Sequence, residues 1–128
     1  MIEFKNVSKV YDNGSVALDD VCLTINDGEF VLICGHSGAG KSTLFKLLTH
    51  EVVPDTGTVI VDDFDVTRMK RSKIPKLRRK LGVVFQDFRL LPNKTVSENI
   101  AFALEVIEEK PKVIKEKVSH VLELVGLT

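Results

Sequence analysis

The chain has 128 residues, which is the length of one ordinary domain. Hydrophobic residues make up 44% of it and charged residues 28%, values that exclude a disordered tail and a collagen-like repeat. The 18 Lys and Arg residues balance the 18 Asp and Glu residues, so the net charge does not indicate a general polyanion-binding protein.

Antiparallel strands are predicted at the start of the chain. Apolar residues from residue 2 onward predict an extended segment, Asn13 and Gly14 predict a turn, and the alternation over 16–25 predicts a second strand with one buried face. The continuous apolar segment 30–34 predicts a central parallel strand that is buried on both faces and ends at Gly35.

Helices and further strands alternate in the rest of the chain. Apolar spacing from Lys41 predicts a helix that packs on the sheet, and 57–61 and 81–85 have the length and composition of strands. A capping-box pattern at Thr95 predicts the start of another helix, and a last helix is predicted from Pro111.

Neither a membrane-spanning segment nor a secretory signal is predicted. The longest apolar runs are far shorter than the roughly 20 residues that a bilayer requires, and the N-terminal residues lack a signal pattern. Cys22 and Cys34 lie in strand-like segments and are expected to be reduced core residues. His50 and His120 have no partner at metal-ligand spacing and receive no role.

One motif in the chain carries chemistry. Residues 35–42 read G-H-S-G-A-G-K-S, which satisfies G-x-x-x-x-G-K-[ST] between a predicted strand and a predicted helix. Glycines let backbone N–H groups of 37–43 approach phosphate oxygens, and the helix start adds the positive end of its dipole. We expect Lys41 to contact the β and γ phosphates, Ser42 to ligate Mg²⁺ and Thr43 to support the α-phosphate. The candidate nucleotide-binding residues here are Gly35, Ser37, Gly38, Ala39, Gly40, Lys41, Ser42 and Thr43; His36 occupies a variable position and receives no role.

With this loop in place, the chain resembles the nucleotide-binding domain of ABC-type ATPases over its whole length. Residues 4–11 look like the family's opening strand, and 85–87 (F-Q-D) look like its Q-loop. The resemblance implies that Tyr11 stacks on adenine and that Gln86 reaches Mg²⁺ and the attacking water, which makes Lys41 and Gln86 the catalytic candidates. It also implies an α/β P-loop fold with an N-terminal antiparallel β portion, with the core in 1–96 and the start of a helical subdomain in 97–128.

A narrower resemblance connects the chain with the cell-division members of that family. It is carried by 35–43, 66–68, 77–79, 85–91 and 95–104, although other ABC exporters share several of these strings. It implies an integral membrane partner that binds near the Q-loop, a second ATPase copy, and a peripheral position on the cytoplasmic face of the membrane. ATP turnover would there control cell-wall hydrolases.

The 128 residues contain no L-S-G-G-Q signature, and the family's Walker B carboxylates and switch histidine are not recognised. We therefore expect a truncated, N-terminal part of such a domain that binds ATP and hydrolyses it poorly. A regulatory nucleotide-binding module without turnover is the alternative. Val59 to Asp62 superficially resembles a Walker B strand, but Asp62, Asp63 and Asp65 more simply form a polar turn.

The sharpest charge asymmetry lies in residues 68–80, which contain eight basic residues and no acidic one. A solvated helix face is the simplest interpretation. The functional alternative is attraction to an anionic membrane surface or to an acidic segment of the membrane partner. Nucleic acid is not an expected partner, because no aromatic residue interleaves the charges.

Overall fold

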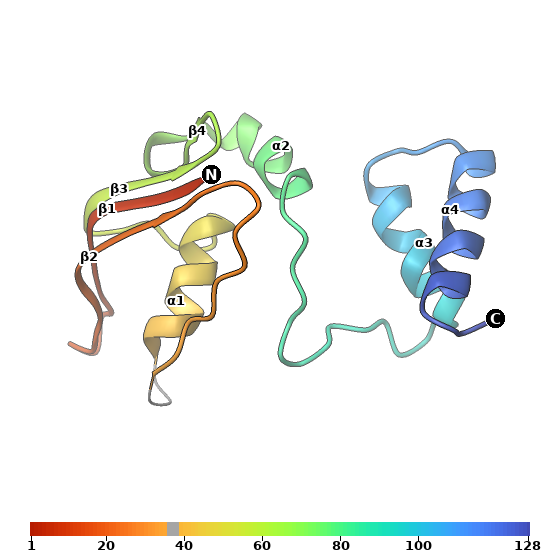
Figure 1. The fold of residues 1–128 in the computed structure, drawn as a ribbon, viewed down its shortest axis with the longest axis horizontal. Helices are drawn as coiled ribbons and strands as arrows, with labels where there is room; N and C mark the ends of the chain where they lie inside the picture. The colour runs from red at the N-terminus through yellow and green to blue at the C-terminus, as the bar shows by residue number, and fades with distance from the viewer. Residues whose placement is uncertain (36–38) are drawn as a thin grey trace. The chain divides into compact units, whose positions relative to one another are not determined.

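The computed structural model describes residues 1–35 and 39–128 (Figure 1). The chain forms two compact units, Met1–Gly82 and Val83–Thr128. The first unit is built around a sheet, and the second around two helices.

The first unit contains a four-stranded sheet in the order β2-β1-β3-β4. Its strands are β1 (Ile2–Val10), β2 (Val16–Ile25), β3 (Thr56–Val61) and β4 (Phe64–Asp65). Every pairing is antiparallel, with Phe4 opposite Leu23 on β2 and Val59 on β3. The predicted antiparallel β portion and the turn at Gly14 are therefore confirmed.

Helix α1 (Ala39–Leu48) packs on this sheet (Figure 1). Its apolar stripe places Leu44 and Leu47 in the same core as the inward-facing residues of β1 and β3, because helical positions three residues apart share one face. The buried hydrophobic residues of this core are Phe4, Val7, Leu18, Leu44, Leu47, Val59, Val61, Val66 and Leu77.

Short helical segments complete the first unit. They are η1 (Val66–Arg68), η2 (Arg71–Lys73) and α2 (Ile74–Arg79). Val66 and Leu77 anchor this stretch in the core. The exposed Arg78 contacts α1 instead: its Nε donates to the carbonyl oxygen of Thr49, just beyond the C-terminal end of that helix, at 3.0 Å.

Two predicted strands, 30–34 and 81–85, are wrong: neither segment is in a strand. Phe30 is 91% exposed and Val84 is 96% exposed. A parallel strand that is buried on both faces needs a hydrogen-bonded neighbour and covering helices. In the described part of the chain, the strands pair with one another and none pairs with either segment.

The expectation of buried cysteines is wrong for a related reason. Cys22 and Cys34 are both free thiols, as predicted, but both are exposed. Cys34 lies in the unpaired segment after β2. Cys22 lies on a strand position that faces away from α1 and accepts a hydrogen bond from the Asn6 N–H at 3.3 Å.

The second unit contains two helices, α3 (Val96–Val106) and α4 (Pro111–Leu124), both as predicted. The capping box is present: Thr95 accepts from the Glu98 N–H, and the Glu98 carboxylate accepts from the Thr95 N–H at 2.7 Å. This backbone hydrogen bond lowers the pKa of Glu98. No helix among the described residues is long and apolar enough to cross a membrane.

A bulge between β1 and β3 depends on Gly57. The pairing shifts register between Lys5 and Ser8, and Asn6 and Gly57 both have positive φ, at 50° and 88°. A Cβ at Gly57 would lie 2.6 Å from the Lys5 carbonyl oxygen and closer still to that of Asn6. Only glycine satisfies both the dihedral angle and the backbone approach at this position.

We predict that Gly57→Ala lowers the free energy of unfolding by about 2–4 kcal/mol, because it adds both strain and overlap. Gly82→Ala is the matched control, since a Cβ there meets nothing within 4 Å. Its effect should stay within about 1 kcal/mol. Urea unfolding followed by circular dichroism measures both variants, and equal midpoints would contradict the role given to Gly57.

Candidate nucleotide-binding site

The structure describes both ends of the predicted phosphate-binding loop, Gly35 and Ala39. Gly35 closes the exposed segment after β2, and Ala39 opens α1. The predicted contacts of Ser37 and Gly38 lie outside the described residues. The two ends place the beginning of α1 directly after the loop, as the motif requires.

Gly40 sets the position of the helix start. A Cβ on this residue would lie 2.9 Å from the Ala17 carbonyl oxygen of β2, closer than real Cβ atoms approach. The absence of a side chain therefore lets the first turn of α1 rest on the sheet. The helix N-terminus then presents free N–H groups and the positive end of its dipole to the loop.

Lys41 reaches back across the loop. Its Nζ donates to the Gly35 carbonyl oxygen at 2.9 Å, so the ammonium lies where the strand-like segment and the helix meet. Ser42 is exposed in the first turn of α1. The first turn contains no acidic residue, and residues 30–48 contain none at all. This set of donors without a competing carboxylate suits a polyphosphate anion.

Thr43 and Tyr11 form the second contact of the site. The Thr43 side chain has no exposed surface, and its Oγ1 is 2.7 Å from the Tyr11 hydroxyl. Tyr11 follows β1 and is half-buried. Its N–H donates to the Ser15 carbonyl oxygen at 2.9 Å, which fixes the turn that carries the ring. The structure thus brings together the residues predicted for the base and for the α-phosphate.

The sequence reasoning missed two residues that support Tyr11. The Lys9 Nζ lies 5.7 Å from the centre of the Tyr11 ring and 3.6 Å from an Asp55 carboxylate oxygen. The other Asp55 oxygen accepts from the Val10 N–H at 2.6 Å. Lys9 was detectable because the predicted opening strand ran to Tyr11, and residues two positions apart share one side of a strand. Asp55 had no signal in the sequence.

Gln86 lies in the second unit and is exposed. The segment around it is irregular, with positive φ at Phe88 (61°) and Arg89 (46°). The Arg89 guanidinium stacks on the Phe85 ring, 3.9 Å from its centre. The other predicted catalytic residue, Lys41, belongs to the first unit.

Asn99 organises the loop that follows this segment, and the sequence reasoning also missed it. Its Oδ1 accepts from the Leu91 N–H at 2.7 Å, and its Nδ2 donates to the carbonyl oxygens of Leu91, Lys94 and Thr95. An Asn inside a predicted helix was the available signal, because its amide competes for backbone groups.

Asp62 takes part in a surface contact. It lies in the β3–β4 turn with φ 51°, and its carboxylate accepts from the Met1 ammonium at 2.7 Å. This ion pair lowers the pKa of Asp62. The residues described contain no cluster of three or more His, Cys, Asp or Glu that could hold a metal. The geometry supports the polar-turn interpretation over a Walker B strand.

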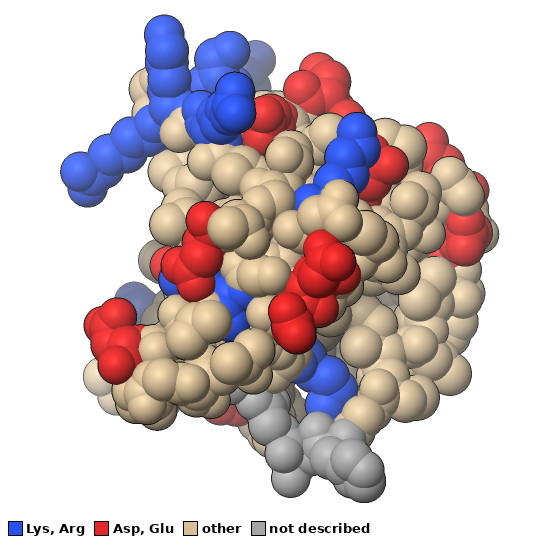
Figure 2. Space-filling model, turned by 90° about the vertical axis from the view of Figure 1, so that its left-hand side faces the viewer, with Lys and Arg blue, Asp and Glu red and all other residues tan. Residues whose placement is uncertain are grey.

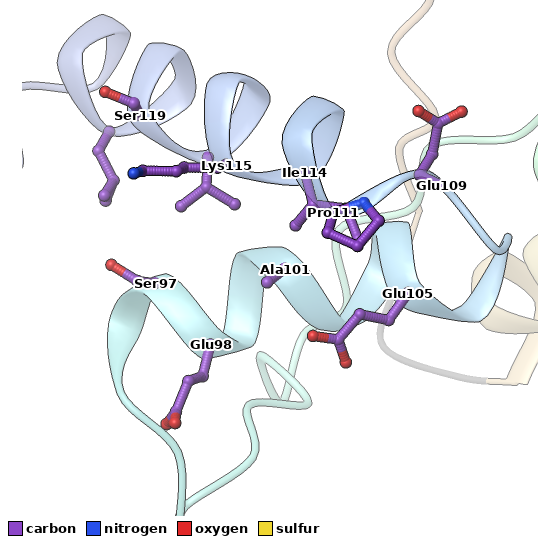
Figure 3. A pocket seen from close by; sticks show the side chains of 11 residues that line it. Ser97, Glu98, Ala101, Glu105, Glu109, Pro111, Ile114, Lys115 and Ser119 are labelled. Atoms are coloured by element: carbon purple, nitrogen blue, oxygen red, sulfur yellow. The ribbon is translucent and has the colours of Figure 1, made fainter.

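A groove lies between α3 and α4 in the second unit (Figure 3). Ala101 and Ile114 face each other across it, and Glu98, Glu105 and Glu109 lie along its sides. None of the residues predicted to bind nucleotide lines it. Its charged lining residues are these three glutamates and Lys115, a net negative set that is unsuited to a polyphosphate.

Comparison with known proteins agrees with the phosphate-loop geometry. The family model described as ABC transporter matches residues 18–128. The chain belongs to the ABC transporter family. This ABC transporter chain is 54% identical to the cell division ATP-binding protein FtsE of Bacillus subtilis, with 99% of the chain and 56% of the relative covered. It is 47% identical to FtsE of Mycobacterium tuberculosis, with coverage of 100% and 56%.

Other members of the family are also similar to this ABC chain. The methionine import ATP-binding protein MetN of Helicobacter pylori (strain ATCC 700392 / 26695) is 42% identical, with 99% of the chain and 39% of MetN covered. The post-hydrolysis dimer of the ATP-binding cassette MJ0796, bound to ADP and Pi, has a TM-score of 0.87 and 33% identity over 100% of the chain and 58% of that structure. The predicted ABC ATPase fold class is confirmed, and the chain spans about half the length of the curated relatives it matches.

We predict that Asn99→Ala raises hydrogen exchange of the Leu91 amide by about 10-fold, because the side-chain acceptor of that N–H is removed. Asn93→Ala is the matched control, since Asn93 is an exposed asparagine of the same loop. Unchanged exchange at Leu91 in the Asn99 variant would contradict the proposed hydrogen bond from the Leu91 N–H to the Asn99 side chain.

Proposed function

We propose that this chain binds MgATP as part of an ATP-binding subunit of the FtsE type, and that the subunit couples ATP turnover to an FtsX-type membrane protein in cell division. The observation that carries the proposal is the start of α1, where Gly40 rests on Ala17 and Lys41 spans the loop to Gly35. The similarity to FtsE over 99% of the chain supports the cell-division assignment. MetN, at 42% identity, supports a transport ATPase as the alternative.

The residues present fit MgATP. Lys41 would hold the β and γ phosphates, Thr43 the α-phosphate, and Tyr11 the adenine. The exposed Ser42 hydroxyl has the oxygen donor that Mg²⁺ prefers, and Gln86 is the second proposed ligand. Bound Mg²⁺ would neutralise charge on the phosphates. The remaining loop residues Gly35, Ser37, Gly38, Ala39 and Gly40 would supply backbone N–H groups.

Turnover is proposed for the assembled subunit rather than for these 128 residues alone. We propose that two copies of the subunit form a dimer in which each contributes donors to the phosphates of the bound nucleotide. The MJ0796 cassette to which the chain is similar is a dimer bound to ADP and Pi. Residues 97–128 would begin the helical subdomain, and the membrane partner would bind near Gln86 on the cytoplasmic face. A regulatory module without turnover is the weaker alternative.

We predict that Lys41→Ala raises the Kd for MgATP by about 10- to 100-fold, because it removes charge-assisted contacts to the phosphates. Lys46→Ala is the control, since Lys46 is an exposed lysine on the same helix. Isothermal titration calorimetry measures both, and circular dichroism shows whether the fold is retained. Equal affinities in the two variants would contradict the proposed site.

The basic segment 68–80 is proposed to bind an anionic lipid surface. All eight basic residues are exposed. Within the part of the chain that the structure describes, only the side chains of Arg78 and Lys80 have a hydrogen-bond or ion-pair partner, the Thr49 carbonyl oxygen and Asp63. Lys and Arg side chains project from one edge of the face in Figure 2, at the height of β4 and α2 in Figure 1. Unneutralised charges of this density attract anionic lipid at about 1 kcal/mol each.

We predict that replacing Arg71, Lys76 and Arg79 by Glu lowers partitioning onto phosphatidylglycerol vesicles by about 100-fold. Arg78 is left in place because it holds the end of α1. Lys94, Lys110 and Lys112, replaced together by Glu, form a control with the same change in net charge. Equal cosedimentation of the two triple variants would contradict a specific basic surface.

A further inference from the structure

One hydrogen bond connects the two ends of the proposed site. The Tyr11 hydroxyl lies 2.7 Å from the Thr43 Oγ1, and the two residues are 32 positions apart in the chain. Tyr11 is carried by a turn after β1, whereas Thr43 is the fifth residue of α1. The aromatic ring proposed to contact the base is therefore bonded to the helix turn proposed to contact the phosphates.

We infer that the Tyr11 hydroxyl is a positioning group for phosphate binding, which acts through Thr43 and is distinct from stacking of the ring on the base. This inference rests on the proposed function of the site. It assigns to Tyr11 an effect on ligands that contain no base. Stacking alone predicts no such effect.

The chemistry of the two hydroxyl groups permits this role. Each can donate one hydrogen bond and accept others. When the Tyr11 O–H donates to the Thr43 Oγ1, the bond ties the turn after β1 to the helix position directly after Lys41 and Ser42.

Burial makes Thr43 dependent on this contact. The Thr43 side chain has no exposed surface, so water does not replace a lost partner without cost. The Tyr11 ring has a contact of its own, because the Lys9 ammonium lies 5.7 Å from its centre and 3.6 Å from an Asp55 carboxylate oxygen. The Tyr11 hydroxyl is the hydrogen-bond partner of the buried Thr43 Oγ1.

Tyr11→Phe separates the hydroxyl from the ring. Phe retains the aromatic face for a base and loses only the oxygen that reaches Thr43. Inorganic triphosphate with Mg²⁺ has phosphates but no base to stack. Its affinity, measured by competition against a fluorescent ATP analogue, therefore reports on the hydroxyl alone.

We predict that Tyr11→Phe raises the Kd of Mg-triphosphate by about 2- to 10-fold, the effect of one neutral hydrogen bond. The same substitution should have this effect in a Thr43→Ser background, which retains a hydroxyl, and no effect in a Thr43→Val background, which has none. This double-mutant comparison removes the direct effect of the Thr43 substitution itself.

Tyr11 also supplies an optical readout, since the chain has one Tyr and no Trp. Without any ligand, Thr43→Val should change the tyrosine emission and increase its quenching by acrylamide, whereas Thr43→Ser should resemble the unsubstituted chain. Circular dichroism and thermal unfolding establish that each variant is folded.

Three results would overturn the inference. The first is an unchanged Kd of Mg-triphosphate in Tyr11→Phe, and the second is unchanged tyrosine emission in Thr43→Val. The third is failure of Mg-triphosphate to compete while MgATP binds normally, which would leave the proposed function intact. Failure of the unsubstituted chain to bind either ligand would instead contradict the proposed function, and the inference with it.

Discussion

The approach of Gly40 to the Ala17 carbonyl oxygen is the constraint on which the first unit depends. A side chain at Gly40 would meet that oxygen at 2.9 Å and push α1 away from β2. Because the helix can rest there, Leu44 and Leu47 reach the core of the sheet. The same contact fixes where the helix begins, and hence where its N–H groups and the Lys41 side chain point. Packing and the proposed phosphate site are thus consequences of one missing Cβ.

The site is built from segments that are distant in sequence but joined by few polar contacts. Lys41 bonds to Gly35, and Thr43 bonds to Tyr11. These contacts tie both the segment after β2 and the turn after β1 to the N-terminal half of α1. The match to the ABC transporter family over residues 18–128 agrees with a phosphate-binding loop at the start of α1. The charge of the site also favours an anion, because residues 30–48 contain no Asp or Glu that would repel one.

Local patterns predicted the elements that local interactions stabilise. The alternation in 16–25, the Asn-Gly turn and the capping box at Thr95 each specify their own structure, and each is confirmed. The strands predicted at 30–34 and 81–85 were wrong because a doubly buried strand is defined by its neighbours, and none is paired with them among the described residues. The Tyr11–Thr43 hydrogen bond and the hydrogen bonds of the Asn99 side chain depend on the paths of loops. The spacing of residues in the sequence does not encode these paths. The roles of Lys41, Ser42 and Gln86 stay predictions.

Hydrogen exchange of the chain with and without MgATP tests the central claim most directly. The account predicts that ATP protects the backbone amides of Lys41, Ser42 and Thr43 at the start of α1, while amides of α4 exchange as before. It predicts that AMP, which lacks the β and γ phosphates, protects these amides much less. Protection confined to the groove between α3 and α4, or no protection at the start of α1, would contradict the account.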